Sequence, residues 1–364
     1  MVAAAVVAVS GAVEDLLSGR LASQLLLGAP ARRPEHVVGR LLAVQAQDPR
    51  GARLSVRSRS SGLVASDVDH ALSAERSLVI TWLNRGTLHL VAAEDYWWLH
   101  ALTTPQLLTG NERRLRQEGV SPAQAQRGMA VVIEAVTSQG PQTRRQLRDR
   151  LDQEAVPTAG QALVHILMAA SVHGHVLRGP MIGDEHAYVS VPDWLGPPPS
   201  PLDRDEAVRM LARRYLAGHG PAMAEDLARW AGVPLGEARR GMDAIADEVV
   251  VSPGGLRLVG SGDCAVALPS PRLLGPFDPL LHGWASREPF VGRHTGVVTT
   301  NGVFRPFALV DGRVVATWGL RAGVVSITLL EPTSAGAVEA LVHDGADVSR
   351  FLGLAHRPVV VARR

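Results

Sequence analysis

The sequence predicts an α+β protein in which three tandem winged helix-turn-helix units precede a C-terminal β-rich, barrel-like scaffold domain. Residues 13–93 show helical patterns followed by a two-stranded hairpin, which is the element order of a winged helix. A short pattern then recurs in Gly140–Leu147 and Gly220–Leu227, each time between two helical runs and ahead of a β-like segment. From about Cys264 the chain changes to short strands and turns. These features favour repeated helical units followed by a β domain.

The same features give the expected domain boundaries. Residues 1–12 are interpreted as a disordered tail, because they are apolar but lack the basic segment of a secretion signal. The proline-rich segment Gly196–Pro201 is interpreted as a stiff connector. The boundaries are 13–93 for winged helix 1, 94–129 for a helical connector, 130–195 for winged helix 2, 196–262 for winged helix 3 and 263–364 for the C-terminal β-rich scaffold.

Hydrophobic periodicity and turn residues predict the individual elements. In winged helix 1, helices are predicted over Val13–Leu26, from about Pro34 to the glutamines at 45 and 47, and over Ser66–Ala74. Strands are predicted over Leu78–Leu83 and Thr87–Val91, on either side of the turn Asn84–Gly86. The connector is predicted to begin with one helix from Glu94 to about Arg116. The scaffold is predicted to contain a hairpin of Phe307–Val310 and Arg313–Trp318 around Asp311-Gly312, and a closing helix over Ala335–Phe351.

Composition limits the chemistry that the chain can perform. The 364 residues are 46% hydrophobic and 20% charged, which allows a buried core, and no apolar run could cross a bilayer. Cys264 is the only cysteine, which excludes an internal disulfide, an iron–sulfur cluster and a cysteine-based zinc site. His173 and His175 lack a third ligand nearby, so we expect no metal. We expect a cytoplasmic protein with no cofactor and no membrane partner.

The basic side chains other than histidine are all arginine, and the sequence contains no lysine. Without an ε-amine, no side chain can form a Schiff base with a sugar. Arginine stays charged and makes forked contacts with phosphate. The codon use of a GC-rich genome would produce the same replacement, so the arginine content alone does not establish nucleic-acid binding.

The segment Gln45-Ala46-Gln47-Asp48-Pro49 is the strongest candidate for a site. Pro49 disfavours helical geometry at the residue before it, so the helix from Pro34 is expected to stop within or just after the glutamines. Residues two apart share a face only in an extended segment, so Gln45 and Gln47 can converge only where the chain unwinds. Two uncharged amides could hold one water without acting as a strong base. The alternatives are two solvated glutamines at a helix end, and Asp48 as a rival catalytic group or a turn cap.

Four motifs follow one another along nearly the whole chain: Gln45–Pro49, Thr81–Val91, Phe277–Trp284 and Val310–Trp318. In this order they resemble the AlkZ/YcaQ family of bacterial DNA glycosylases. The resemblance implies a C-shaped assembly of tandem winged helices held by the β-rich scaffold. It also implies excision of N7-alkylguanine from DNA and unhooking of azinomycin-type interstrand cross-links, as DNA repair and antibiotic self-resistance. One branch of the family has a glutamine–small residue–glutamine signature, which implies that Gln45 and Gln47 are catalytic.

The residues are compatible with this chemistry. Alkylation at N7 puts a positive charge on guanine and makes the base a good leaving group, so placing a water and stabilising the sugar cation are enough. The expected enzyme is a monofunctional hydrolase without lyase activity, since the chain has no lysine. The expected partner is double-stranded DNA with an N7-alkylguanine or an interstrand cross-link, and the chain is expected to be a monomer.

Arginines near the motifs and in the first repeat copy are the candidates for DNA contacts. They are Arg50, Arg53, Arg57, Arg85, Arg144, Arg145 and Arg148. The family also probes DNA with a β-hairpin, for which the segment around Arg293 and His294 is nominated. Each of these arginines could instead be a solvated surface residue.

Two functions without catalysis remain open. Winged-helix repeats also occur in DNA-binding regulators, although no obvious dimerisation helix is present. Trp82, Trp97 and Trp98 could bind a toxin directly in a drug-sequestering resistance protein, although buried tryptophans are more often part of a core.

Overall fold

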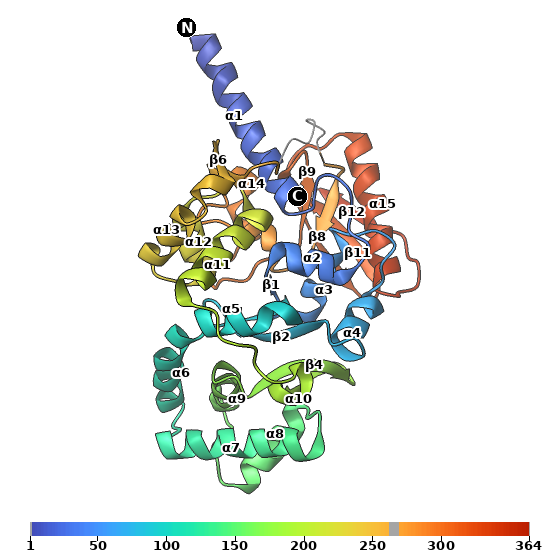
Figure 1. The fold of residues 1–364 in the computed structure, drawn as a ribbon. Helices are drawn as coiled ribbons and strands as arrows, with labels where there is room; N and C mark the ends of the chain where they lie inside the picture. Colours follow the sequence, from blue (N-terminus) through green and yellow to red (C-terminus); the bar gives the residue numbers. More distant parts are fainter. Residues whose placement is uncertain (1, 262–268, 364) are drawn as a thin grey trace. The chain divides into compact units, whose positions relative to one another are not determined.

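The computed structural model describes residues 2–261 and 269–363 (Figure 1). Cys264, where the change to short strands was predicted to begin, lies outside the described residues. The chain divides into two compact units. The first unit combines Met1–Val68 with Val208–Arg364, and the second unit is Asp69–Ala207. Both contain helices and antiparallel strands, so the α+β class is confirmed.

The N-terminal part of the first unit contains α1 (Val2–Ser23), α2 (Pro34–Leu41), β1 (Val44–Gln45), α3 (Pro49–Arg57) and the start of α4 (Ala65–Ser73). Helix α1 covers residues that were expected to be a disordered tail. The prediction that the second helix reaches the glutamines is wrong, because α2 ends at Leu41. Leu42 has a φ of 64°, which cannot continue a right-handed helix, and its side chain is fully buried. Core packing of Leu42, and not Pro49, therefore ends α2.

The middle of the first unit contains α11 (Arg204–His219), α12 (Ala224–Ala231), α13 (Leu235–Asp243), a short 3-10 turn η2 (Ala246–Glu248) and the two-stranded sheet of β6 (Val249–Ser252) and β7 (Gly255–Leu258). The sequence predicted two helical runs and a hairpin after the proline-rich connector, and the structure adds α12, which begins inside the repeat segment Gly220–Leu227.

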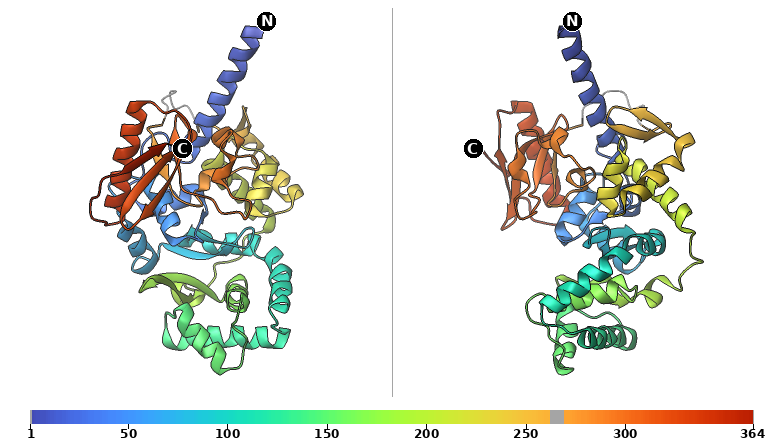
Figure 2. Two further views of the ribbon diagram at one scale, coloured as in Figure 1. Left: turned by 180° about the vertical axis from the view of Figure 1, so that it is seen from behind. Right: turned by 90° about the vertical axis from the view of Figure 1, so that its left-hand side faces the viewer.

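The C-terminal sheet of the first unit is open (Figure 2). Its order is β12-β11-β10-β9-β8, and α15 (Ala335–Phe351) packs against β8 and β11. The strands are β8 (Arg272–Leu274), β9 (Phe307–Val310), β10 (Arg313–Arg321), β11 (Val324–Leu329) and β12 (Val360–Arg363), and the links include η3 (Pro279–Leu281), α14 (Glu288–Val291) and η4 (Thr295–Val297). The predicted hairpin at Asp311-Gly312 is confirmed by the pairing of Arg313 with Val310. The barrel-like prediction is wrong for the described residues, because β8 and β12 are free edges of one sheet.

The second unit has a sheet in which two hairpins lie side by side in the order β3-β2-β4-β5. The hairpins are β2 (Leu78–Leu83) with β3 (Thr87–Ala92), and β4 (Val176–Ile182) with β5 (Glu185–Ser190). The surrounding helices are η1 (Ala93–Asp95), α5 (Tyr96–Thr103), α6 (Pro105–Gln117), α7 (Pro122–Gln139), α8 (Arg144–Gln153), α9 (Ala162–Val172) and α10 (Val191–Leu195). The single helix predicted from Glu94 is divided at Pro105, which lacks the N–H needed inside a helix and instead begins α6.

The internal repeat has the same local structure in both copies. Gln142 exchanges backbone hydrogen bonds of 2.9 and 2.8 Å with Tyr188, and Ala222 exchanges bonds of 3.0 and 2.8 Å with Leu256. The next residue is the N-cap of a helix, and a side chain three residues further along reaches back to the N-cap amide. Gln146 accepts the N–H of Thr143 at 2.8 Å, and in the second copy Asp226 accepts the N–H of Met223 at 3.0 Å. Each copy thus joins a helix start to one strand of its own hairpin.

The described helices include none that is both long enough and apolar enough to span a membrane.

Candidate active site

The two glutamines of the first motif converge. Gln45 ends the short strand β1, and Gln47 lies two residues further along an extended segment. The Nε2 atom of Gln45 donates a hydrogen bond of 2.5 Å to Oε1 of Gln47. Gln45 is buried, with 7% of its surface exposed, whereas Gln47 is exposed. The structure therefore brings the predicted pair together at the protein surface, because α2 ends four residues before Gln45 and the chain is extended there.

Asp48 fixes the turn that follows the glutamines. Its carboxylate accepts the backbone N–H of Gly51 at 2.8 Å, which makes Asp48 the N-cap of α3, and Pro49 occupies the first helical position. The sequence left two roles open for Asp48, and the structure shows the capping role. The cap holds the end of the extended segment, and thereby Gln47, against α3.

Helix α3 packs directly against the turn of the third motif. A Cβ atom on Gly51 would lie 2.5 Å from the carbonyl oxygen of Pro276, and one on Gly275 would lie 2.9 Å from Cβ of Leu54. Both positions therefore require glycine for the backbones to approach this closely. The result is that the residues before Phe277 lie against the first turns of the helix that follows Gln47.

A buried ion pair further along the chain also holds the third motif against the segment after α3. Arg59 and Asp278 are both fully buried, and the guanidinium donates two hydrogen bonds of 2.9 and 2.8 Å to the carboxylate. Gln24 accepts a further N–H of Arg59 at 3.0 Å, and Asp278 also accepts the N–H of Leu280 at 2.9 Å. Paired in this way, both charges tolerate burial. The pair joins the segment directly after α3 to the third sequence motif within the first unit.

Two of the predicted DNA contacts on α3 are wrong. The Arg57 side chain is 2% exposed and pairs with the carboxylate of Asp344 at 2.6 Å. Arg53 is buried and donates a hydrogen bond of 2.8 Å to the carbonyl of Pro49. Neither guanidinium is available to phosphate. Their helical spacing places them on the inner face of α3, a helix that the sequence analysis did not predict.

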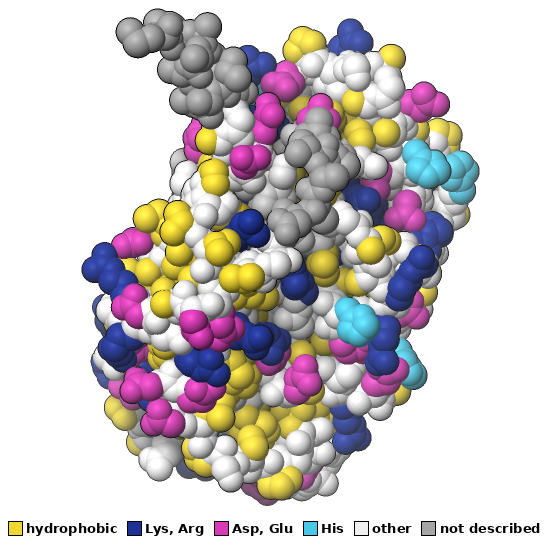
Figure 3. All heavy atoms as spheres, turned by 45° about the horizontal axis from the view of Figure 1, so that its top comes forward, with side chains coloured by type: hydrophobic (Ala, Val, Ile, Leu, Met, Phe, Trp, Pro, Cys, Tyr) yellow, Lys and Arg dark blue, Asp and Glu magenta, His cyan; other side chains and the backbone are white. Residues whose placement is uncertain are grey.

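The other predicted arginines are more accessible. Arg50 is exposed on α3, three residues after Gln47, and Arg85 is exposed in the turn between β2 and β3. On α8, Arg145 and Arg148 are exposed and Arg144 is half-buried. The face of the molecule in Figure 3 shows arginine and acidic side chains interspersed, as expected from a formal net charge of only +2. Their contact with DNA stays a prediction.

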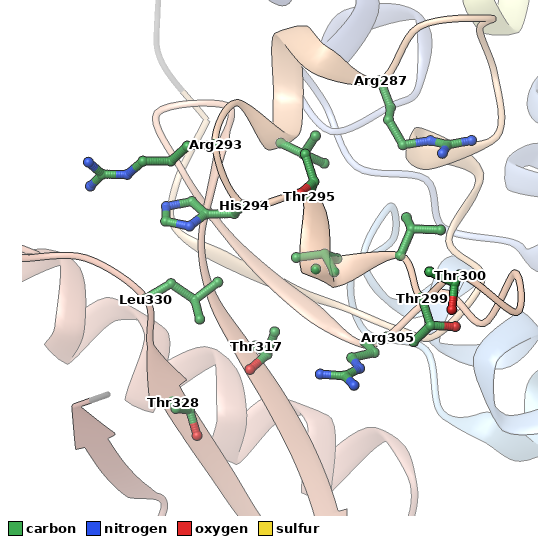
Figure 4. Close-up of a pocket in the computed structure, with 14 residues that line it drawn as sticks. Arg287, Arg293, His294, Thr295, Thr299, Thr300, Arg305, Thr317, Thr328 and Leu330 are labelled. Carbon is green, nitrogen blue, oxygen red and sulfur yellow. The ribbon is translucent and has the colours of Figure 1, made fainter.

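The segment around Arg293 and His294 borders a cavity of about 930 Å³ in the first unit (Figure 4). Its lining includes no carboxylate but several hydroxyls and three arginines. These residues are Arg287, Arg293, His294, Thr295, Thr299, Thr300, Arg305, Thr317 and Thr328, with five apolar or glycine positions completing the lining. Val298 and Phe304 form a β-bridge, so residues 298–304 make a small hairpin at one wall. Arg293 and His294 themselves lie in a turn ahead of η4, so the hairpin begins four residues after His294 and not at the nominated residues. Its contact with DNA stays a prediction.

Glu331 lies next to this cavity and neutralises part of its charge. It accepts hydrogen bonds of 2.9 Å from His294 and 3.0 Å from Arg293. The bond from His294, followed by that from Arg293, holds the pKa of the Glu331 carboxyl below its ordinary value against the opposing effect of burial. Arg293 nevertheless keeps 73% of its side-chain surface exposed.

Arg287 and Arg305 line the same cavity and were not predicted from the sequence. The Nε atom of Arg287 is buried with no hydrogen-bond partner among the described residues. Its guanidinium lies 5.2 Å from the ring centre of Phe304, a cation–π contact. Burial, and then the charge of Arg229, lower the pKa of Arg287. Isolated arginines carry no sequence signal, so only the folded chain identifies them as a cationic wall.

The three tryptophans of the sequestration hypothesis do not line one common cavity in the second unit. Trp82 is buried and lies under the guanidinium of Arg178, at 5.1 Å. Trp97 and Trp98 line a cavity of about 400 Å³ together with the connector residues 198–202.

The described residues include no group of three or more histidine, cysteine, aspartate or glutamate side chains placed to hold a metal ion.

Comparisons with known proteins identify the family. The model of a family described as DNA glycosylase AlkZ-like matches residues 38–351, which is most of the chain. The chain belongs to the AlkZ-like DNA glycosylase family. A relative from Streptomyces sahachiroi named interstrand DNA cross-link repair glycosylase is 27% identical over 379 aligned residues, covering 95% of this chain and 98% of the relative. The solved structure of Streptomyces sahachiroi DNA glycosylase AlkZ is similar with a TM-score of 0.79 at 26% identity, covering 96% of this chain and 98% of that one.

Family membership confirms the resemblance that the four motifs carried. This AlkZ-like chain is therefore an enzyme of the DNA glycosylase class, which hydrolyses N-glycosyl bonds. The regulator and sequestration alternatives lose their support as the main function, because neither requires the paired glutamines or the match over residues 38–351.

Proposed function

We propose that this AlkZ-like enzyme releases N7-alkylguanine from double-stranded DNA by hydrolysis, and that it unhooks interstrand cross-links formed through N7. The observation that carries this proposal is the hydrogen bond between Gln45 and Gln47 at the end of β1. The pair presents amide groups, and no strong base, at a surface bordered by the cap of Asp48. Such a site suits a substrate whose leaving group is already activated.

Gln45 and Gln47 orient the attacking water and stabilise the sugar. Gln45 uses one amide hydrogen on Gln47, so its Oε1 remains an acceptor for a hydrogen of the water. The water oxygen forms a bond to C1′ while the C1′–N9 bond breaks. The bonding electron pair passes to the cationic purine, which leaves uncharged, and the proton of the water passes to solvent. The amide oxygens face the positive charge that develops on the deoxyribose.

The two glutamine amides assist the departure of the base only weakly, and this makes the reaction selective for alkylated guanine. An unmodified guanine is a poor leaving group and would need a general acid, which two amides do not supply. An N7-alkylated guanine needs only the placed water. The reaction ends at an abasic site, because the chain has no lysine to form the Schiff base of a lyase.

The proposed action on cross-links requires contacts with the DNA duplex. A cross-linked base is tethered to both strands and cannot swing fully out of the duplex, so the enzyme has to reach it in place. We propose that the two repeat copies are winged helices, that the exposed arginines Arg50, Arg85, Arg145 and Arg148 contact phosphates, and that Arg144 assists. On the first unit, the cavity bordered by Arg293 and His294 adds Arg287 and Arg305. The name of the Streptomyces sahachiroi relative, interstrand DNA cross-link repair glycosylase, supports cross-links as a substrate. Self-resistance to DNA-alkylating antibiotics is the context that we propose for this activity.

A base-release assay tests the proposed function. Duplexes carrying 7-methylguanine, a bulky N7 adduct or an N7–N7 cross-link are incubated with the protein, and released base and alkali-labile sites are measured. We expect release from the alkylated duplexes, no release from unmodified duplex, and strand scission only after alkali. Absence of release from all three lesions would reject the proposal, and scission without alkali would reject the monofunctional mechanism.

A further inference from the structure

Phe277 has a backbone conformation that is unusual for an aromatic residue. Its φ is 56°, in the left-handed region that L residues other than glycine, asparagine and aspartate rarely adopt. Strain of this kind persists only where neighbouring contacts fix the chain, and it concentrates at functional sites.

The contacts on both sides of Phe277 are fixed by the site itself. On one side the carbonyl of Pro276 presses against Gly51 of α3. On the other side Asp278 is held by the two hydrogen bonds from buried Arg59. Phe277 therefore has to span two anchored positions, and its ring is held where this backbone places it.

The ring belongs to an aromatic cluster and is itself partly exposed. Its centre lies 5.8 Å from that of Phe304 and 6.3 Å from that of His282, and the latter two are 3.8 Å apart. Arg287 covers Phe304 on the side of the cavity. The cluster thus backs Phe277 with packed rings, which leaves a rigid aromatic surface that needs little ordering on binding.

The backbone next to this surface packs against the segment that follows the glutamine pair, although Phe277 is far from the pair along the chain. The position of a Cβ on Gly51 is within 3.4 Å of Cβ of Asp48 and within 2.5 Å of the carbonyl oxygen of Pro276. Asp48 directly follows Gln47, and Phe277 directly follows Pro276. The backbone on which the Phe277 ring is mounted therefore lies against the helix that follows the glutamines.

An aromatic face has one property that an aliphatic side chain lacks. It attracts cations through its quadrupole, and it stacks on any nucleobase. N7 alkylation turns guanine into a cation without greatly changing its shape. A charge-sensitive ring beside the glutamines would therefore distinguish the lesion before the chemical step.

We propose that Phe277 is a specificity-determining residue whose ring contacts the alkylated purine and favours its positive charge. The assignment deepens the proposed function and rests on it for the identity of the base. It gives recognition of charge to an aromatic side chain, whereas Gln45 and Gln47 act on water and sugar. Loss of the ring should weaken binding of the cationic lesion and leave binding of a neutral base of the same shape unchanged.

The test compares two cleavage-resistant duplexes with the same methyl group. One contains 2′-fluoro-7-methylguanosine, which is cationic, and the other contains 7-methyl-7-deazaguanosine, which is neutral. We expect the wild-type protein to prefer the cationic duplex by about tenfold in Kd, the scale of one cation–π contact. Phe277→Tyr should keep the preference, and Phe277→Leu should remove it. An unchanged preference in Phe277→Leu, or equal binding of both duplexes by the wild type, would overturn the assignment.

A strain-relieved pair of variants separates recognition from folding. Phe277→Gly removes both ring and strain, so it should fold stably but lose the preference. Ala322→Gly relieves a φ of 49° in the turn between β10 and β11 and should keep the preference. A selective Phe277→Gly protein would also overturn the assignment. The readout is binding, so a wild type that prefers the cation but releases no base would reject the proposed function and leave this assignment standing.

Discussion

Two arginine-rich regions of the first unit differ in whether their arginines are buried or line a cavity without carboxylates. On α3 and directly after it, Arg53, Arg57 and Arg59 are buried, and the last two pair with carboxylates of residues more than 200 positions away. Around the 930 Å³ cavity, Arg287 and Arg305 face a lining without carboxylates. The comparison teaches that clustering in the sequence does not identify a phosphate site. The availability of a carboxylate partner decides, and it becomes visible only in the fold.

The largest effect is expected from breaking the Arg59–Asp278 pair. Asp278→Ala leaves a buried guanidinium unpaired and should lower the free energy of unfolding by about 3–5 kcal/mol. Chemical denaturation followed by tryptophan fluorescence measures this loss. Replacing both residues together, Arg59→Met with Asp278→Leu, should recover much of it. A loss below about 1 kcal/mol in Asp278→Ala would show that the pair is not structural.

A smaller loss of stability is expected on α3. Arg57→Gln removes a charged hydrogen bond to Asp344 and should lower the free energy of unfolding by about 1.5–3 kcal/mol. The salt dependence of DNA binding should not change, because Arg57 cannot reach phosphate. A reduced salt dependence in this variant would contradict its structural role.

At the cavity we expect little loss of stability but a clear change in the salt dependence of DNA binding. Arg287→Gln with Arg305→Gln should lower the free energy of unfolding by no more than about 1 kcal/mol, the scale of the cation–π contact between Arg287 and Phe304. The slope of log Kd against log salt for undamaged duplex should become shallower by about 0.9 for each lost phosphate contact. Arg321→Gln, at an exposed arginine outside the cavity lining, is the matched control. Equal slopes in the cavity and control variants would remove the cavity from the DNA interface.

The smallest effect concerns Glu331. Its pKa is lower in the fold than in the unfolded chain, so its contribution is complete above about pH 5 and is lost as the pH falls through the folded pKa. Glu331→Gln should therefore reduce stability slightly at pH 7, by less than about 1 kcal/mol for a partly exposed pair. Thermal unfolding of both proteins should converge below the folded pKa. A constant difference at all pH values would contradict the ion pair.

The repeats and hairpins could be predicted from the sequence because they depend on local signals. Glycine turns, alternating strands and helix-start residues such as Thr143 with Gln146 act within a few positions. Helix α3 was missed although Asp48-Pro49 is a typical helix start, because Pro49 was interpreted only as the end of the preceding helix. The end of α2 could not be predicted, since burial of Leu42 depends on distant packing.

The candidate site divides in the same way. Convergence of Gln45 and Gln47 was predictable, because it needs only an extended segment. Phe277, Arg59 and Asp278 meet it through contacts that cross more than 200 residues, and no local pattern reports such contacts. The open sheet in place of a barrel is a similar case, because strand order depends on long-range pairing.

Single-turnover release of 7-methylguanine shows whether the glutamine pair performs the chemistry. We expect Gln45→Ala with Gln47→Ala to slow release by at least about a hundredfold, the scale of a lost transition-state contact. The same variant should bind undamaged duplex like the wild type, and Gln126→Ala, at an exposed glutamine of α7, should react at the wild-type rate. Release at the wild-type rate by the double variant would contradict the account and place the chemistry elsewhere.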